Sequence, residues 1–282
     1  MNDIIENLKN RYQQGDITIK LIFICCALFL ITKLLDIFLS RNGLLLENFF
    51  AAKTGLDGFI SQPWGMITYA FFHGGLLHLV LNMVFIYYIG RLFLGYFRKE
   101  DFLTFFLSGA IVGAFFFMVL AKYLNYGNNL LGASAGIYAV FFALVSYTPK
   151  NRIRLMFLNT GITFETIAWI FLAFDLFSIL SNQNVGGHIS HLGGAAFGYF
   201  YMKQFEKGND FIGSLFRKSK APKREKPKST YRRPPRDDYE FNAMKVEKQQ
   251  KMDRILDKIS RSGYESLSNA EKEFLFKEGK NN

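Results

Sequence analysis

Residues 187–202 read GHISHLGGAAFGYFYM. The stretch is apolar enough for a membrane helix, yet it contains histidine, serine and glycine. His191, Gly194 and Gly198 recur at the helical spacing i, i+3 and i+7, so they form one stripe with two small positions below the histidine. Small residues on such a stripe let a second membrane helix approach closely. The stretch therefore predicts a membrane helix that packs against a neighbour.

The first 202 residues contain five more apolar segments of similar length. Because the hydrocarbon core of a bilayer is about 30 Å thick, an apolar segment of about 20 residues is a candidate span. We predict an all-α polytopic membrane protein, with a bundle of six transmembrane helices over residues 20–202. The predicted spans are 20–39, 76–94, 102–123, 131–147, 162–180 and 187–202.

The charge distribution supports this division of the chain. Residues 1–202 carry 13 basic and 10 acidic side chains, whereas residues 203–282 carry 21 and 13. A soluble domain as long as the first part would need far more charge to cover its surface, so an ordinary soluble enzyme is excluded. The only cysteines, Cys25 and Cys26, are adjacent and cannot staple distant parts of the chain.

The basic residues also predict an orientation, because Lys and Arg favour cytoplasmic loops. With residues 1–19 as a cytoplasmic segment rather than a cleaved signal peptide, nine basic residues of the first 202 fall inside and three outside. We therefore predict a multi-pass protein of the cell (plasma or inner) membrane with both termini cytoplasmic. Segment 41–72 would lie in the outer interface, with Trp64 and Tyr69 at the headgroup level. A simple loop is the alternative.

The chain's four histidines lie in or next to the predicted spans, where an ionisable group is costly and suggests function. The second, fourth and sixth spans run in the same direction, so their first turns share the outer level of the bilayer. The second span contributes His78 and Asn82 at i, i+4, the fourth contributes Ser134, and the sixth contributes His191. We expect these side chains to converge toward the outer face.

This set of residue types suits a base-activated serine nucleophile. Gly132 and Gly136 flank Ser134 and permit a close approach that brings it within hydrogen-bond reach of His191. Tyr138, one turn further along, would then lie beside the imidazole and orient it.

An acyl-transfer site also needs hydrogen-bond donors for the developing oxyanion. His78 and Asn82 offer side-chain donors, and the backbone N–H of Ser134 is free at the start of a helix. Each of these motifs is weak alone, and a GxSxG string outside a strand-to-helix turn carries little information. Their coincidence on three helices that start on one side carries the hypothesis.

A third, acidic member of the site is not evident in the sequence. Asp36, Asp175 and Glu165 are the acidic candidates within the spans, and we interpret Asp175 as a structural residue lying inward of the active level. We therefore expect a Ser–His dyad. His188 and His191 could ligate a metal at i, i+3, but no HExxH motif, cysteine or nearby carboxylate set accompanies them. We expect neither a metal nor a cofactor.

Over about residues 55–202 the chain resembles the rhomboid family of intramembrane serine proteases. The resemblance lies in HxxxN (His78 to Asn82), GxSxG (Gly132 to Gly136) and HxxGxxxG (His191 to Gly198), in this order and at these depths. It implies a six-helix core with a water-filled site open to the outside.

Carried over to this chain, the resemblance implies that Ser134 is the nucleophile and His191 the general base. His78, Asn82 and the Ser134 amide would form the oxyanion hole, and Tyr138 would stack on the base. The reaction implied is hydrolysis of peptide bonds in or near transmembrane segments of membrane-protein substrates. A catalytically silent rhomboid-like protein that binds membrane proteins is the alternative.

One departure from the family concerns the outer segment. The family often has Trp-Arg there, and this chain has Trp64-Gly65. We expect the departure to affect the anchoring of the segment and not the chemistry.

The last 80 residues predict a different kind of structure. Residues 203–239 are basic and proline-rich, which is typical of a disordered linker attracted to anionic lipids of the bilayer. No motif favours nucleic acid. Residues 240–282 predict a small cytoplasmic helical hairpin, with a first helix ending at Ser262-Gly263 and a capping box from Ser268 to Glu271 opening the second. It is either a weakly folded appendage or a docking module for a cytoplasmic partner.

Overall fold

The computed structural model describes residues 2–39, 45–124, 126, 129–153, 161–216, 238–268, 270–272 and 274–275. The chain divides into two compact units, Met1–Lys220 and Ala221–Asn282. Each unit is described by itself below.

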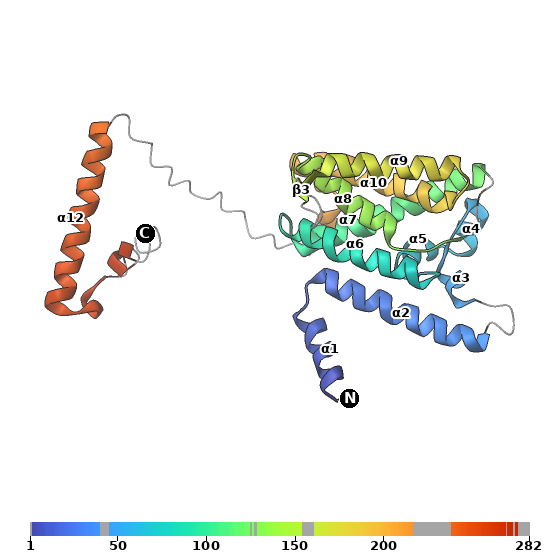
Figure 1. The fold of residues 1–282 in the computed structure, drawn as a ribbon, viewed down its shortest axis with the longest axis horizontal. Coiled ribbons are helices and arrows are strands. Elements are labelled where there is room, and N and C mark those ends of the chain that lie inside the picture. Colours follow the sequence, from blue (N-terminus) through green and yellow to red (C-terminus); the bar gives the residue numbers. More distant parts are fainter. Residues whose placement is uncertain are drawn as a thin grey trace. The chain divides into compact units, whose positions relative to one another are not determined.

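The first unit is a bundle of helices, and each predicted span coincides with one of them (Figure 1). The predicted all-α polytopic membrane fold is confirmed. Two short antiparallel pairs of strands complete the bundle. The long helices are α2 (Ile17–Leu39), α6 (Leu76–Leu94), α7 (Lys99–Phe116) with the π-helical turn η3 (Phe117–Ala121), α8 (Ser134–Tyr147), α9 (Phe164–Leu180) and α10 (Val185–Glu206).

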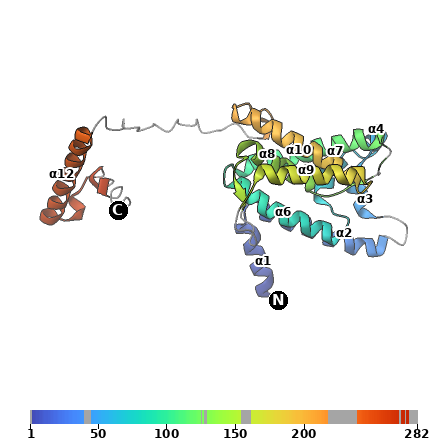
Figure 2. The ribbon, with the colours of Figure 1, turned by 45° about the horizontal axis from the view of Figure 1, so that its top comes forward.

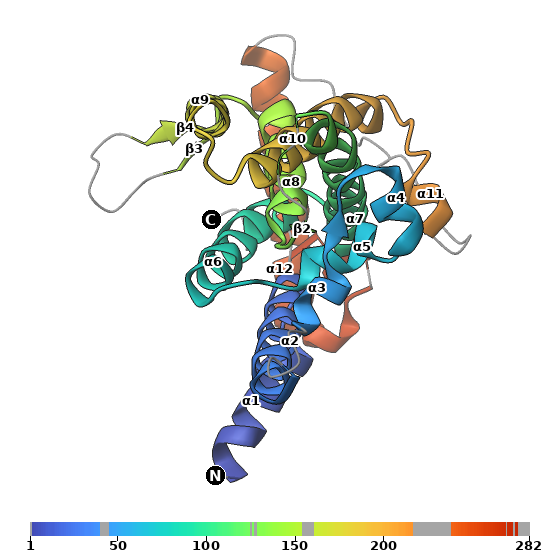
Figure 3. The same cartoon turned by 90° about the vertical axis from the view of Figure 1, so that its right-hand side faces the viewer.

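Three helices of the described residues are both long and apolar enough to cross a bilayer, namely Ile17–Phe38, Leu76–Leu94 and Lys99–Ala121. Helix α8 is apolar but shorter, and its 14 residues extend only about 21 Å. It contacts α6, α7, α9 and α10, and an end-on view shows it among them (Figure 3). Because protein surrounds α8, the thickness of the lipid does not set its length.

Small residues hold α8 against its neighbours. A Cβ added to Gly194 of α10 would lie 2.1 Å from the Ala135 carbonyl oxygen, and one added to Gly198 would lie 2.0 Å from that of Ala139. On another side of α8, a Cβ on Gly109 of α7 would lie 2.1 Å from the Ala139 Cβ. The stripe of small residues on α10 therefore packs directly against the backbone of α8, as the sequence predicted.

The segment between α2 and α6 is folded rather than a simple loop. Strand β1 (Ala52–Lys53) pairs antiparallel with β2 (Asn129–Leu130), with Ala52 opposite Leu130. Trp64 is 40% exposed, but Tyr69 is fully buried and donates its hydroxyl to the Ala110 carbonyl at 2.8 Å. Tyr69 therefore packs inside the bundle, and its level relative to the lipid headgroups stays a prediction. The elements of this segment are α3 (Leu46–Phe50), β1 (Ala52–Lys53), α4 (Gly55–Ser61), α5 (Gly65–Thr68) and η2 (Tyr69–Phe71).

The glycine that departs from the family pattern has a packing role. A Cβ on Gly65 would lie 2.3 Å from the Ala51 carbonyl oxygen, so α5 packs against β1 with no room for a side chain. Other residues anchor the segment instead. Gln62 Nε2 donates to the Ala51 carbonyl at 2.6 Å, and Trp64 Nε1 donates to the Phe49 carbonyl at 2.7 Å.

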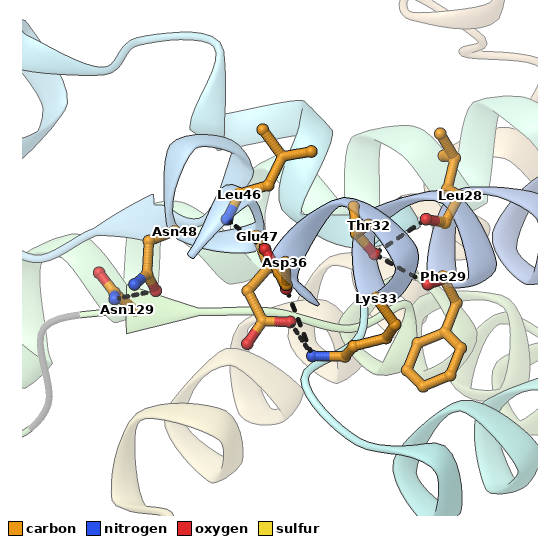
Figure 4. Close-up of polar contacts among 9 residues, drawn as sticks. All are labelled: Leu28, Phe29, Thr32, Lys33, Asp36, Leu46, Glu47, Asn48 and Asn129. Atoms are coloured by element: carbon orange, nitrogen blue, oxygen red, sulfur yellow. Dashed lines mark hydrogen bonds and ion pairs between the residues drawn. The ribbon is translucent and has the colours of Figure 1, made fainter. Parts of the chain in front are cut away.

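A polar cluster joins α2 to α3 (Figure 4). Lys33 Nζ lies 2.5 Å from Glu47 Oε2, and Asp36 Oδ1 accepts the backbone N–H of Leu46 at 2.8 Å. Both charged residues of α2 in this cluster are therefore paired with the segment that follows the helix. Asp36, one of the acidic candidates from the sequence, has this structural role.

The remaining elements of the first unit lie at its edges. Helix α1 (Asn2–Gln14) precedes α2, and β3 (Arg152–Ile153) pairs with β4 (Ile162–Thr163) between α8 and α9. Helix α10 continues past the predicted end of the sixth span, and α11 (Gly213–Phe216) lies within the range predicted as linker. Of the predicted linker, 203–239, residues 217–237 lie outside the described residues.

The second unit contains α12 (Asp238–Ser262), the turn η4 (Tyr264–Ser266) and helical residues at 270–272 and 274–275. Gly263 has a φ of +75°, which suits glycine at a helix end. The predicted capping box is present, since Ser268 N donates to Glu271 Oε2 at 2.7 Å and Glu271 N donates to Ser268 Oγ at 3.3 Å. Hydrogen bonds from Lys258 and Ser268 lower the pKa of Glu271 to about 2.

Candidate active site

Ser134 and His191 meet where α8 and α10 pack together. Ser134 Oγ lies 2.7 Å from His191 Nε2, although the two residues are 57 positions apart in the sequence. Ser134 is the first residue of α8, so its side chain stands at the open end of the helix. The glycine contacts of α10 with Ala135 and Ala139 bring the two backbones close enough for this hydrogen bond.

The residue two positions before Ser134 is glycine for two reasons. Gly132 has a φ of +118°, a backbone conformation that side chains disfavour. A Cβ at this position would also lie 2.6 Å from ring atoms of His78. The His78 imidazole therefore lies over the backbone that leads into Ser134. His73 is buried and its ring centroid is 5.3 Å from that of His78, so it adjoins the site without lining the cavity.

Asn82 lies one turn below His78 on α6. Its side chain is buried, and Nδ2 donates to the His78 carbonyl at 2.8 Å. An amide nitrogen carries two hydrogens, so this bond leaves one for another acceptor. Asn82, His78 and Ser134 all line the same cavity.

Tyr138 stacks on His191. The ring centroids are 4.3 Å apart and the planes are inclined by 18°. Tyr138 also stacks on Phe171 of α9, with centroids 5.6 Å apart. The tyrosine therefore lies between the imidazole and α9, in the place that the sequence predicted for it.

Asp175 of α9 lies beside the two histidines of α10, which the sequence did not predict. Its side chain is fully buried, and Oδ1 lies 2.9 Å from His191 Nδ1 and 2.6 Å from His188 Nδ1. The expectation that Asp175 lies inward of the active level is wrong, and so is the expectation that no carboxylate accompanies the histidines. Ser134, His191 and Asp175 form a hydrogen-bonded chain.

A signal in the sequence could have placed Asp175 correctly. Helices α9 and α10 form an antiparallel hairpin, and they lie side by side in two views (Figures 1 and 2). Asp175 precedes the end of α9 by about as many residues as His191 follows the start of α10. Equal distances from the connecting turn put the two residues at one level.

The site opens into a cavity of about 600 Å³. Helices α6, α8 and α9 and the start of α10 supply its walls. Most of the lining is apolar, including Phe85, Phe171 and Phe174, and Ser134 and His191 are among the polar residues that line it. A mostly apolar cavity with a few polar groups suits a mostly apolar ligand.

Comparisons with known proteins agree with this fold. Residues 61–205, just over half of the chain, match the family model of the rhomboid domain. The chain therefore belongs to the rhomboid family. Residues 237–278 match a family of unknown function (DUF6576).

Curated relatives share the same part of the chain. Presenilin-associated rhomboid-like protein A, mitochondrial, of Danio rerio is 27% identical over 142 residues, which is 49% of this chain and 36% of that protein. The presenilin-associated rhomboid-like proteins, mitochondrial, of Bos taurus and Homo sapiens are each 26% identical over 142 residues, covering 49% of this chain and 37% and 36% of those proteins. The match thus spans little more than a third of the relatives' length.

Proposed function

We propose that this chain is an intramembrane serine endopeptidase that hydrolyses peptide bonds in or near transmembrane segments of membrane proteins. The hydrogen bond between Ser134 Oγ and His191 Nε2, at 2.7 Å, is the observation that carries the proposal. Both residues line the large cavity of a rhomboid-family bundle. A nucleophile within hydrogen-bond reach of a base, with the base held by a third group, is the arrangement of serine hydrolases.

The third group in this proposal is Asp175, in place of the expected dyad. An ionised carboxylate only accepts hydrogen bonds, so the proton of the neutral His191 ring is on Nδ1, facing Asp175. The lone pair of Nε2 then faces Ser134 and can take the hydroxyl proton. Asp175 stabilises the imidazolium that forms and holds the ring in this tautomer.

The reaction then follows the usual steps of acyl transfer. Ser134 Oγ attacks the scissile carbonyl while its proton moves to His191 Nε2. His78, Asn82 and the Ser134 amide donate hydrogen bonds to the developing oxyanion. His191 gives the proton to the leaving amine, and water hydrolyses the ester in the reverse sequence of proton transfers. No metal or cofactor takes part in these steps.

The substrate must present an extended peptide bond to this site. A membrane helix satisfies its own backbone hydrogen bonds, so it has to unwind locally before cleavage. The aromatic walls of the cavity, such as Phe171 and Phe174, would cover the apolar side chains of the unwound segment.

For location, we propose the cell membrane, with both termini in the cytoplasm and the active site toward the outer face. The distribution of Lys and Arg supports this orientation. The names of the curated relatives place those proteins in mitochondria. We further propose that the basic residues after α10 contact anionic lipids and that residues 240–282 bind a cytoplasmic partner.

The test of the function uses the full chain purified in detergent and a fluorescent fluorophosphonate probe. We expect covalent labelling of the wild-type protein, and none of Ser134→Ala. His191→Ala should label at least about 100-fold more slowly, because general-base catalysis contributes roughly 10²- to 10⁴-fold. Ser190→Ala is the matched control, since Ser190 is a buried serine of α10 that donates to the Gly187 carbonyl.

The same experiment distinguishes the catalytically silent alternative. Equal labelling of the wild type and Ser134→Ala would remove the nucleophile assignment. Absence of labelling in a folded wild-type protein would favour the membrane-protein binder.

A further inference from the structure

A second use of the site follows from three side chains that share one point. His188, His191 and Asp175 each offer a donor atom, and these atoms all lie within 4.8 Å of one another. The two histidines come from adjacent turns of α10, and the aspartate comes from α9. We propose that these residues form a Zn²⁺ site, and that zinc bound there blocks the serine chemistry.

The donor set selects this class of metal. Two imidazole nitrogens and one carboxylate oxygen suit Zn²⁺, whereas Mg²⁺ and Ca²⁺ prefer oxygen ligands alone. Three protein ligands leave a fourth position for water. Asp175 Oδ2 is also buried, and it makes no contact of hydrogen-bond geometry with the histidines, so the carboxylate has a second oxygen on the same side chain.

The distances require only a small adjustment. Ligands in a tetrahedral zinc site are roughly 3.3 Å apart, because each lies about 2.0 to 2.1 Å from the metal. Asp175 Oδ1 is now 2.6 Å from His188 Nδ1 and 2.9 Å from His191 Nδ1. Each of these two pairs would have to move apart by less than about 1 Å. The two imidazole nitrogens lie within 4.8 Å of each other and would have to approach by at most about 1.5 Å. The cavity provides a path of entry for the metal, because it is lined by His191 and by Gly187, the residue before His188.

Zinc binding and base catalysis exclude each other at His191. In the free site Nδ1 carries the proton and donates it to Asp175. A metal on Nδ1 needs that lone pair, so the proton of the neutral ring moves to Nε2. Nε2 then donates toward Ser134 and has no lone pair to accept the hydroxyl proton. Inhibition therefore rests on the proposed function, whereas the metal site itself does not.

The binding experiment needs no peptidase activity. Full-length Ser134→Ala, carried on a tag without histidine, is titrated with Zn²⁺ in detergent by calorimetry, and its metal content is measured after dialysis. We expect one zinc per chain. Adding His188→Asn should weaken binding by more than about 10-fold, since asparagine can still donate to Asp175 but lacks an imidazole nitrogen. His73→Asn, a buried histidine outside the cluster, is the matched control and should bind zinc as before.

The inhibition experiment uses the wild-type peptidase rate against zinc concentration. We expect His188→Asn to need at least about 10-fold more zinc for half inhibition, with each variant normalised to its own zinc-free rate. Mg²⁺ at the same concentrations should not inhibit.

The outcomes separate the two proposals. Lack of stoichiometric zinc on Ser134→Ala, or equal binding after His188→Asn, would overturn the metal site. If folded wild-type protein shows no peptidase activity in the absence of zinc, and Ser134→Ala still binds zinc, the proposed function is overturned and the metal site stands. If His188→Asn does not fold, zinc-edge X-ray absorption of Ser134→Ala decides, and a spectrum without two imidazole ligands contradicts the site.

Discussion

Helices α10 and α9 both pack on α8, but they do so in different ways. Gly194 and Gly198 of α10 lie so close to the α8 backbone that an added Cβ would come within about 2 Å of a carbonyl oxygen. Helix α9 buries few residues, and most of its large side chains face outward, such as Phe177 (67% exposed) and Leu180 (84%). One helix is therefore fixed by backbone contacts and the other by side chains.

The difference matches the parts that each helix contributes to the site. Ser134 and His191 come from α8 and α10, whose backbones are in close contact at Gly194 and Gly198. Asp175 and the aromatic wall of the cavity come from α9, whose contacts are side-chain hydrogen bonds and stacked rings. The reacting pair, Ser134 and His191, is thus held by the close backbone contact between α8 and α10. Asp175, which orients His191, is held by the side-chain contacts of α9.

The largest effect should come from breaking the contact between α10 and α8. We expect Gly198→Val to prevent folding or to cost more than about 3 kcal/mol, because the side chain must displace the Ala139 carbonyl and a helix backbone cannot relax around it. Thermal unfolding in detergent and the yield of monodisperse protein measure the change. Gly75→Ala is the control, since a Cβ there meets nothing within 4 Å. Equal stability of the two variants would contradict the close backbone contact.

A smaller effect, on rate rather than folding, should follow from Asp175→Asn on α9. Asparagine can donate to His191 Nδ1 and so favours the wrong tautomer, which should lower kcat by roughly 10²- to 10⁴-fold. The α8–α10 contact is untouched, so the protein should still fold. Asp36→Asn, a change of the same kind in α2, serves as the control and should leave kcat near the wild-type value. A wild-type rate for Asp175→Asn would show that Asp175 is not needed and would favour a Ser134–His191 dyad.

The sequence was sufficient to predict the features that depend on spacing along one helix. The stripe of His191, Gly194 and Gly198 predicted close packing, and the apolar lengths predicted the helices. The packing partner of this stripe, α8, could also be inferred, because α8 and α10 run in the same direction and bring Ser134 and His191 to one level of the bilayer.

Features that depend on two helices running in opposite directions were harder to predict. The level of Asp175 follows only from counting residues back from the turn that joins α9 to α10, and its distance along the chain from Ser134 gives no indication of it. The residue type of Tyr69 likewise does not reveal that its hydroxyl donates to the Ala110 carbonyl inside the bundle. Residue type alone does not show whether a polar group has a buried partner.

The smallest effect should come from Tyr138, which stacks on His191 of α10 and on Phe171 of α9. Tyr138→Phe keeps both stacked rings, so we expect kcat within about threefold of the wild type. Tyr138→Ala removes them, and a ring contact of about 0.5 to 1.5 kcal/mol predicts a loss of up to roughly tenfold. The loss should appear in kcat more than in KM, because the ring orients the base. If Phe is as slow as Ala, the hydroxyl rather than the stacked ring joins the two helices, and the contact of α9 with the site is more polar than we infer.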